Sequence, residues 1–286
     1  MNLIRKSLIL FFFGLPLFNP FSQPADSRTY NEVNDTSLNL KDEYVRLTIR
    51  NAPPLTVQFS VDYNFGIFEL SANDNGDLHT EEFISGQNFG VRHGFGATMI
   101  VKYPLHKEGH LRLNASLMYN RFNSKFNKVF EGEEYDFVKY DVYSASLGLE
   151  NNFTPSFRIK TYVGLGLVGS IISGNARVTY KDASASELSI KPAFRLGLTV
   201  FSGLEYLLRN NVGLNFGLKF THANLWLKES KVSDNPDEIY LNDQRVTNRQ
   251  SFSGFRQFAW GSFFCGVNYY FGVKEKHYYY RKAIDK

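Results

Sequence analysis

The chain has 286 residues, of which 43% are hydrophobic and 16% aromatic, with 32 Lys and Arg against 28 Asp and Glu. This apolar and aromatic content excludes a chain that is disordered throughout. The single cysteine excludes an intramolecular disulfide framework and a four-cysteine zinc site. The formal net charge of +4 is too small to indicate a nucleic-acid partner, so we predict none.

Residues 1–22 have the pattern of a secretory signal peptide. Arg5 and Lys6 precede a mostly apolar segment that ends at Phe18, and a short polar segment follows. The apolar segment is too short to span a bilayer, which needs about 20 residues. We predict cleavage near Ser22, where no cysteine is present to carry a lipid anchor. The alternative is a buried N-terminal helix.

Eight later segments alternate apolar and polar residues, as strands with two different faces do. In the first of them, Val57, Phe59 and Val61 alternate with Gln58 and Ser60. The segments are residues 55–70, 88–103, 110–122, 137–151, 157–171, 191–208, 211–226 and 256–273. They are longer than the 5–6 residues of a typical soluble strand, and the polar face carries charges and glycines. This pattern favours strands with lipid outside and a narrow polar interior.

The connections between these segments alternate between long and short. They run over residues 71–87, 104–109, 123–136, 152–156, 172–190, 209–210 and 227–255. Outer-membrane barrels have short periplasmic turns and long outside loops, so the order predicts an all-β, eight-stranded antiparallel transmembrane β-barrel with both termini periplasmic. Ten strands is the alternative, because Tyr44–Arg50 also has an extended pattern. Pro53 and Pro54 argue that this segment lies outside the barrel wall.

The chain ends its last strand with Gly266-Val-Asn-Tyr-Tyr-Phe-Gly272, and its signal ends in Phe-Ser-Gln. With the eight strands, these features resemble the outer-membrane β-barrel domain proteins of Bacteroidetes-type bacteria, among them the PorT-like group. The resemblance covers residues 55–273. It implies an address in the outer membrane of a Gram-negative bacterium and insertion by the barrel-assembly machinery, with Tyr269 and Phe271 in the aromatic end signal. This chain departs from that pattern by continuing to residue 286.

The predicted organisation has four parts: a signal peptide (1–22), a periplasmic N-terminal segment (23–54), the barrel (55–273) and a basic, Tyr-rich periplasmic tail (274–286). The register predicts a polar network in the lumen. Its members are Asp62, Arg92, Lys102, Arg112, Glu150, Arg158, Lys160, Arg195, Glu205 and Lys219. Glu150 and Arg158 flank a short turn and are expected to pair. We interpret the network as a salt-bridged plug, with a small gated, anion-favouring pore as the alternative.

Candidate chemistry is sparse, and we predict no catalytic residue, cofactor or metal. His222-Ala-Asn224 is similar to the His-x-Ser-Asn element of lipid A deacylases, but asparagine replaces the nucleophilic serine. Residues 71–82 approach a calcium-loop pattern, although Ser71 stands where aspartate is usual. A hairpin tip rich in Asn and Gly explains that segment equally well. Cys265 is expected to face lipid.

The sequence therefore favours a structural or interaction role, including that of a secretion-apparatus accessory, over a pore or a lipid-modifying enzyme. The expected partners are outer-membrane lipids and lipopolysaccharide, the barrel-assembly machinery, and periplasmic or surface proteins. Long outside loops would be displayed on the cell. Within the last loop, residues 238–246 are expected to form a free-standing hairpin that turns at Asn242 and Asp243.

Overall fold

The computed structural model describes residues 44–50, 52–71, 80–126, 136–155, 157–179, 185–209, 211–231, 233–244, 256–273 and 275–281. The chain divides into two compact units, one formed by residues 1–48 and 277–286 and the other by residues 49–276. The predicted signal peptide, and most of the predicted periplasmic segment 23–54, lie outside the described residues.

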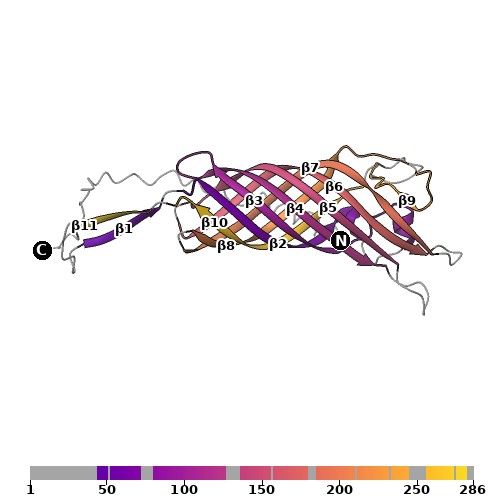
Figure 1. Cartoon of the computed structure of the whole chain (residues 1–286), viewed down its shortest axis with the longest axis horizontal. Coiled ribbons are helices and arrows are strands. Elements are labelled where there is room, and N and C mark those ends of the chain that lie inside the picture. Colours follow the sequence, from indigo (N-terminus) through magenta and orange to yellow (C-terminus); the bar gives the residue numbers. More distant parts are fainter. Residues whose placement is uncertain are drawn as a thin grey trace, which may run out of the picture. The chain divides into compact units, whose positions relative to one another are not determined.

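The larger unit is a closed barrel of eight antiparallel strands (Figure 1). These are β2 (Leu55–Ile67), β3 (His93–Pro104), β4 (Leu111–Lys125), β5 (Phe137–Asn152), β6 (Ile159–Thr179), β7 (Ala185–Arg209), β8 (Val212–Trp226) and β10 (Ala259–Phe271). Each strand pairs with the next along the chain, and β10 pairs with β2 to close the ring. The eight-strand prediction is confirmed. The ten-strand alternative is wrong, because β1 (Tyr44–Arg50) pairs with β11 (Glu275–Arg281) in a separate two-stranded sheet.

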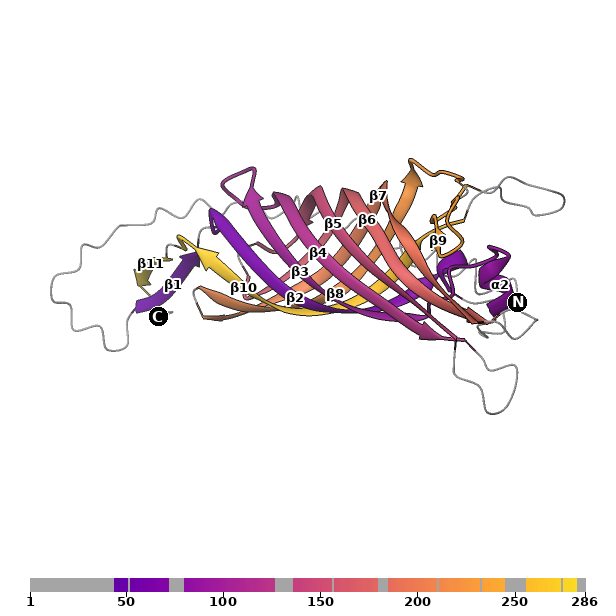
Figure 2. The ribbon, with the colours of Figure 1, turned by 45° about the vertical axis from the view of Figure 1, so that its right-hand side comes forward.

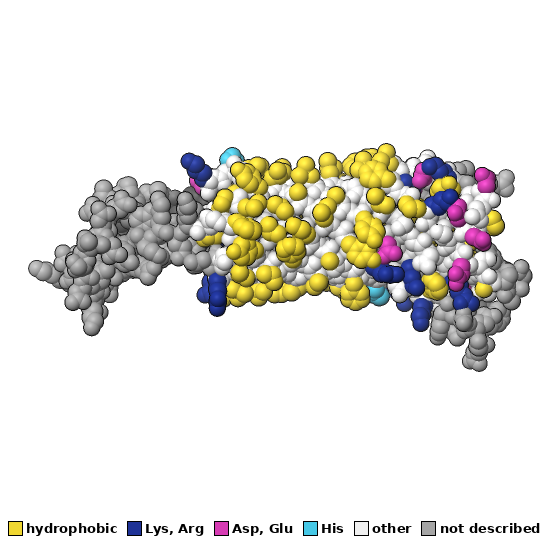
Figure 3. All heavy atoms as spheres, viewed as in Figure 1, with side chains coloured by type: hydrophobic (Ala, Val, Ile, Leu, Met, Phe, Trp, Pro, Cys, Tyr) yellow, Lys and Arg dark blue, Asp and Glu magenta, His cyan; other side chains and the backbone are white. Residues whose placement is uncertain are grey.

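The strands turn their apolar faces outward. Val61 is 67% exposed, whereas its neighbour Asp62 is 2% exposed. Figure 3 shows the resulting apolar belt, with charged side chains gathered beyond its two edges. Exposed aromatic side chains lie toward both edges of the belt: Tyr63, Phe95, Tyr143, Phe194 and Trp226 on one side, and Tyr103, Phe153, Phe157, Tyr269 and Phe271 on the other. A lipid-facing band flanked by aromatic girdles has this arrangement.

The two ends of the barrel differ, and we name them by their connections. The turn end carries the short connections 105–110, 153–158 and 210–211, and the loop end is opposite. At the loop end β6 and β7 continue for 21 and 25 residues, well beyond the 9–11 that a membrane crossing needs. The predicted long loop 172–190 is therefore wrong: most of it is an extension of the β6–β7 hairpin.

The two faces of the strands exchange character toward the loop end, which the sequence analysis did not anticipate. In β5, Val138, Tyr140 and Val142 point inward and are buried, whereas inward positions nearer the turn end are polar, as at Ser144. The outward positions become polar over the same stretch. Apolar residues from several strands and loops form one buried cluster there: Leu70, Phe83, Phe89, Val91, Phe122, Phe126, Val138, Tyr140, Val142, Ile172, Ala176, Val178, Leu188, Ile190, Ala193, Ala223, Leu241, Phe258 and Trp260. Where water replaces lipid outside, the apolar side chains lie inside.

Three short elements cover the loop end. They are η1 (Phe68–Leu70), α2 (Thr80–Ile84) and β9 (Glu238–Ile239), and Figure 2 shows α2 and β9 at this end. β9 pairs in parallel with the extended part of β7. Asp136 fastens α2 to the end of β6, because its carboxylate accepts hydrogen bonds from the Thr80 hydroxyl (2.6 Å) and the Thr179 hydroxyl (2.8 Å).

None of the helices among the described residues has the length and apolar character needed to cross a membrane.

Candidate functional site

Four charged side chains meet inside the barrel near the turn end, and we call them the turn-end ion cluster: Lys102, Arg112, Glu150 and Glu205. Lys102 Nζ lies 2.8 Å from Glu205 and 3.1 Å from Glu150, and Arg112 pairs with both carboxylates, at 2.9 Å from Glu205. All four side chains are at most 4% exposed. Buried charges are tolerated when each is paired in this way.

Neutral side chains extend the cluster to the rest of the wall. The Tyr270 hydroxyl donates to Glu205 (3.2 Å), and the Lys102 ammonium lies 4.3 Å from the centre of the Tyr162 ring. The Tyr162 hydroxyl donates to Asn215 (2.6 Å), whose amide donates to Gln58 (2.7 Å). These eight residues come one from each of the eight strands, so the network connects the whole circumference.

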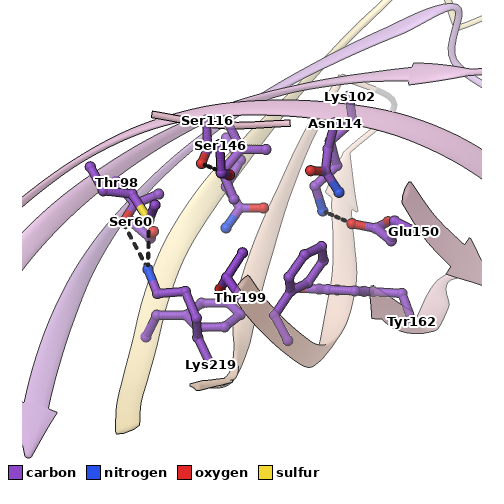
Figure 4. Close-up of a pocket in the computed structure, with 15 residues that line it drawn as sticks. Ser60, Thr98, Lys102, Asn114, Ser116, Ser146, Glu150, Tyr162, Thr199 and Lys219 are labelled. Atoms are coloured by element: carbon purple, nitrogen blue, oxygen red, sulfur yellow. Dashed lines mark hydrogen bonds and ion pairs between the residues drawn. The ribbon is translucent and has the colours of Figure 1, made fainter. Parts of the chain in front are cut away.

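A second polar group lies farther toward the loop end. Lys219 Nζ is 2.9 Å from Asp62 and donates to the Thr98 hydroxyl (3.1 Å), which itself donates to Asp62. Figure 4 shows Lys219 and Thr98 on one side of a cavity and the Lys102–Glu150 pair on the other. The cavity measures about 20 Å³, roughly the space of one water molecule. The lumen is filled by its own side chains.

Two of the ten predicted lumen residues are not in the lumen network, because each lies just before its strand begins. Arg158 is exposed: its Nε donates to the Leu207 carbonyl (3.0 Å), and its guanidinium lies 5.0 Å from the Tyr206 ring centre. The predicted Glu150–Arg158 pair is therefore wrong. Arg92 is half-buried before β3, where Gly90 has a φ of +72° and interrupts the strand pattern.

The other predicted lumen residues point inward and are buried. Lys160 lies with its ammonium 4.7 Å from the Tyr270 ring centre. Arg195 lies nearer the loop end and has a partner that the sequence analysis missed. Its Nε and Nη2 donate to the two oxygens of Asp243, at 2.8 and 3.0 Å.

Asp243 is the centre of a group that we call the loop-end latch: Arg195, Asn224, Glu229 and Asp243. Asp243 is fully buried and also accepts from the Asn224 amide (2.9 Å) and the Glu229 backbone N–H (3.0 Å). The predicted free-standing hairpin at 238–246 is therefore wrong. The described part of the loop lies on the barrel mouth, with Asn242 at a φ of +47°.

Electrostatics at the latch favour its folded form. The pKa of the Glu229 carboxyl is held below its ordinary value because it accepts a hydrogen bond from Lys231 and is paired with Arg195. The neighbouring Lys228 has a lowered pKa because burial disfavours its charged form. Asn224 is occupied as well, since its amide donates to the Arg256 carbonyl and its oxygen accepts from the Phe258 N–H.

The remaining candidate elements have structural partners. Glu82, the last position of the calcium-like pattern, accepts a hydrogen bond from the Asn88 amide (2.9 Å), and residues 72–79 of that pattern lie outside the described residues. The described part of the chain contains no group of three His, Cys, Asp or Glu side chains placed to hold a metal ion. Cys265 is exposed on the outer face of β10, as expected.

A closed ring of eight antiparallel strands, apolar outside and polar inside, defines a transmembrane β-barrel of the outer-membrane type. No model of a known protein family matches the chain, and no curated protein does.

Solved structures offer three likenesses. Neisserial surface protein A is 17% identical, with a TM-score of 0.41, covering 76% of this chain and 97% of its own. Ail, the attachment invasion locus protein of Yersinia pestis, is 11% identical with a TM-score of 0.37, covering 78% and 99%. The N-terminal β-barrel domain of Pseudomonas aeruginosa OprF is 13% identical with a TM-score of 0.33, covering 76% and 97%.

Proposed function

We propose that this protein is a non-conducting, non-catalytic barrel of the outer membrane of a Gram-negative bacterium, which anchors a folded loop end and presents it to partner molecules. The filled lumen is the observation that carries the proposal. The turn-end ion cluster closes one end, and the buried apolar cluster closes the other. A barrel that leaves only about 20 Å³ between them is suited to anchoring rather than to transport.

The proposed orientation has the loop end outside the cell and both termini in the periplasm. Support comes from the connections: three of the four at the turn-end side are short turns or the chain termini, as in barrels with short periplasmic turns. In that orientation the outer-membrane lipids and lipopolysaccharide contact the apolar belt, and the barrel-assembly machinery meets the aromatic end of β10.

A role as an accessory of a secretion apparatus is the finer form of this proposal, and the PorT-like resemblance is what suggests it. The sheet of β1 and β11 is compatible with such a role. A two-stranded sheet leaves both of its outer edges without a strand partner, and such edges pair readily with another chain.

The arrangement of His222 and Asn224 disfavours lipid hydrolysis by this element. Asn224 is buried and its amide group bonds Asp243, Arg256 and Phe258. The residue that stands in place of a nucleophile thus holds the last loop on the barrel.

Site-specific photo-crosslinking in intact cells tests the presenting role. A photoreactive residue replaces the exposed Asp237 at the loop end, and a matched one replaces the lipid-facing Leu147. We expect discrete protein or lipopolysaccharide adducts at position 237 that diminish when Asp243→Ala opens the latch. Identical adducts with and without that change, or adducts at Leu147 only, would contradict the proposal.

A further inference from the structure

A second, larger cavity lies at the loop end, outside the lumen network. It measures about 360 Å³, within the range of roughly 300–1,000 Å³ that small-molecule sites occupy. One wall comes from α2 and the turn after it, including Phe83. The other walls come from the extended part of β7, including Leu188 and Ile190, and from β9 and the residues after it, including Ile239 and Leu241.

The walls are held in place by Arg256. Its guanidinium donates to the carbonyls of Leu241 (2.7 Å), Asn242 (2.7 Å) and Asn88 (3.2 Å), and lies 4.3 Å from the centre of the Phe89 ring. One buried side chain thus joins the first loop, the last loop and β10. The cavity is preformed, which lowers the conformational cost of binding a ligand.

Tyr140 indicates what the cavity can recognise. It lines the cavity and is 2% exposed, between the rings of Phe89 and Phe258. Its hydroxyl has no hydrogen-bond partner among the described residues, although buried hydroxyl groups are ordinarily bonded. A ligand with a hydrogen-bond acceptor would satisfy it.

The charge of the lining favours an acid over an amine. Among the described lining residues Arg256 is the one charged side chain, and none is Asp or Glu. The apolar walls suit a hydrocarbon or aromatic body. We propose that the loop-end cavity binds small amphiphilic carboxylates, with the apolar body between Phe83 and Leu188 and the carboxylate accepting from the Tyr140 hydroxyl. This site goes beyond the anchoring role and does not depend on it.

The test uses the full-length protein in lipid nanodiscs and measures binding of 3-phenylpropionate by saturation-transfer NMR, with empty nanodiscs subtracted. The uncharged 3-phenylpropionamide and the cationic 3-phenylpropylamine are the comparison probes. We expect saturable binding of the acid, weaker binding of the amide and none of the amine. Tightest binding by the amine, or no saturable binding of the acid, would overturn the proposal.

Matched variants locate the site. Tyr140→Phe removes only the hydroxyl and should weaken acid binding about five- to tenfold, as loss of one hydrogen bond does. Tyr143→Phe makes the same change on the lipid face of β5 and should leave binding unchanged. Leu188→Trp, or Ile239→Trp where that variant does not fold, fills the cavity and should abolish binding. Undiminished binding in Tyr140→Phe and in a folded cavity-filling variant would overturn the proposal, whatever crosslinking at Asp237 shows.

Discussion

Glu205 has the largest number of lumen partners in the turn-end ion cluster. Its carboxylate contacts Lys102, Arg112 and the Tyr270 hydroxyl while having no exposure to solvent. Burial alone would make a carboxylate costly, but two cations and a hydroxyl donor offset that cost. The charge at this position therefore stabilises the barrel only as part of the group.

We expect Glu205→Gln to destabilise the barrel, because Lys102 and Arg112 would then share only Glu150. Breaking a fully buried pair costs about 3–5 kcal/mol, and the remaining carboxylate makes the loss smaller than that. Glu238→Gln, which disrupts the partly exposed pair with Lys191, should cost about 0–1 kcal/mol. Urea unfolding in detergent micelles, followed by tryptophan fluorescence, measures both. Equal effects of the two changes would show that the cluster is not buried as described.

Glu229 gives the loop-end latch a dependence on pH. Because its pKa is lower in the folded protein than in the unfolded one, its contribution is fully present above the ordinary pKa of 4.5 and is lost as the pH falls through the lowered value. Hydrogen exchange of residues 227–244 should therefore be unchanged between pH 7 and pH 5, after correction for intrinsic rates. Below about pH 4.5 it should rise more in the native protein than in Glu229→Gln. The same pH dependence in both would exclude Glu229 as the cause.

Residue-level pairing was only partly predictable from the sequence. Alternation placed Asp62, Lys102 and Glu205 on the inner face, because a strand's period fixes which face a side chain occupies. It failed at Arg158, since a residue in a turn does not follow the strand period. Strand alternation also cannot say which inward charges meet across the lumen, as Lys102 and Glu205 do from strands that are not neighbours.

At the scale of elements, β5 shows both what alternation reveals and what it conceals. The period of two is continuous from Phe137 to Asn152, so the strand was predicted nearly to its ends. The exchange of apolar and polar faces near Val142 keeps that period, so a test for period alone does not detect it. A comparison of the two faces along the strand would have revealed where it leaves the lipid.

The last loop is the element whose structure depends most on a single residue. Asp243→Ala removes the partner of the buried Arg195 and the acceptor for Asn224 and the Glu229 N–H. We expect trypsin to cleave within 227–244 at least about tenfold faster, because loss of a buried ion pair lowers the free energy of local opening by more than 1.4 kcal/mol.

The barrel itself should remain resistant to SDS at room temperature in this variant. Asp237→Ala changes an exposed residue of the same loop and is the matched control, with cleavage as in the native protein. Unchanged cleavage in Asp243→Ala would mean that the latch does not hold the loop.

At the scale of the whole molecule, closure of the ring was predictable and the covering of its mouth was not. An even number of amphipathic segments leaves few ways to satisfy every backbone group in lipid. The mouth depends on contacts between segments far apart in the chain, such as Arg256 with Asn88, which no local pattern specifies.

The proposed orientation predicts which residues are accessible on intact cells. In a Cys265→Ser background, a cysteine at Asp237 should react with a membrane-impermeant maleimide, and one at Glu108 in a turn-end connection should react only after the outer membrane is opened. Both positions are exposed in the folded protein, so the comparison reports sidedness. The reverse pattern would invert the orientation and place the loop-end cavity in the periplasm.

The central claim is that the lumen is closed by its own side chains, and single-channel recording in planar lipid bilayers tests it most directly. The native protein, inserted with its heat-modifiable fold intact, should give no ion conductance above that of the bare bilayer, because only about 20 Å³ remains between the two polar groups of the lumen. Stable, reproducible conductance steps from the folded protein would contradict the closed lumen and the anchoring function built on it.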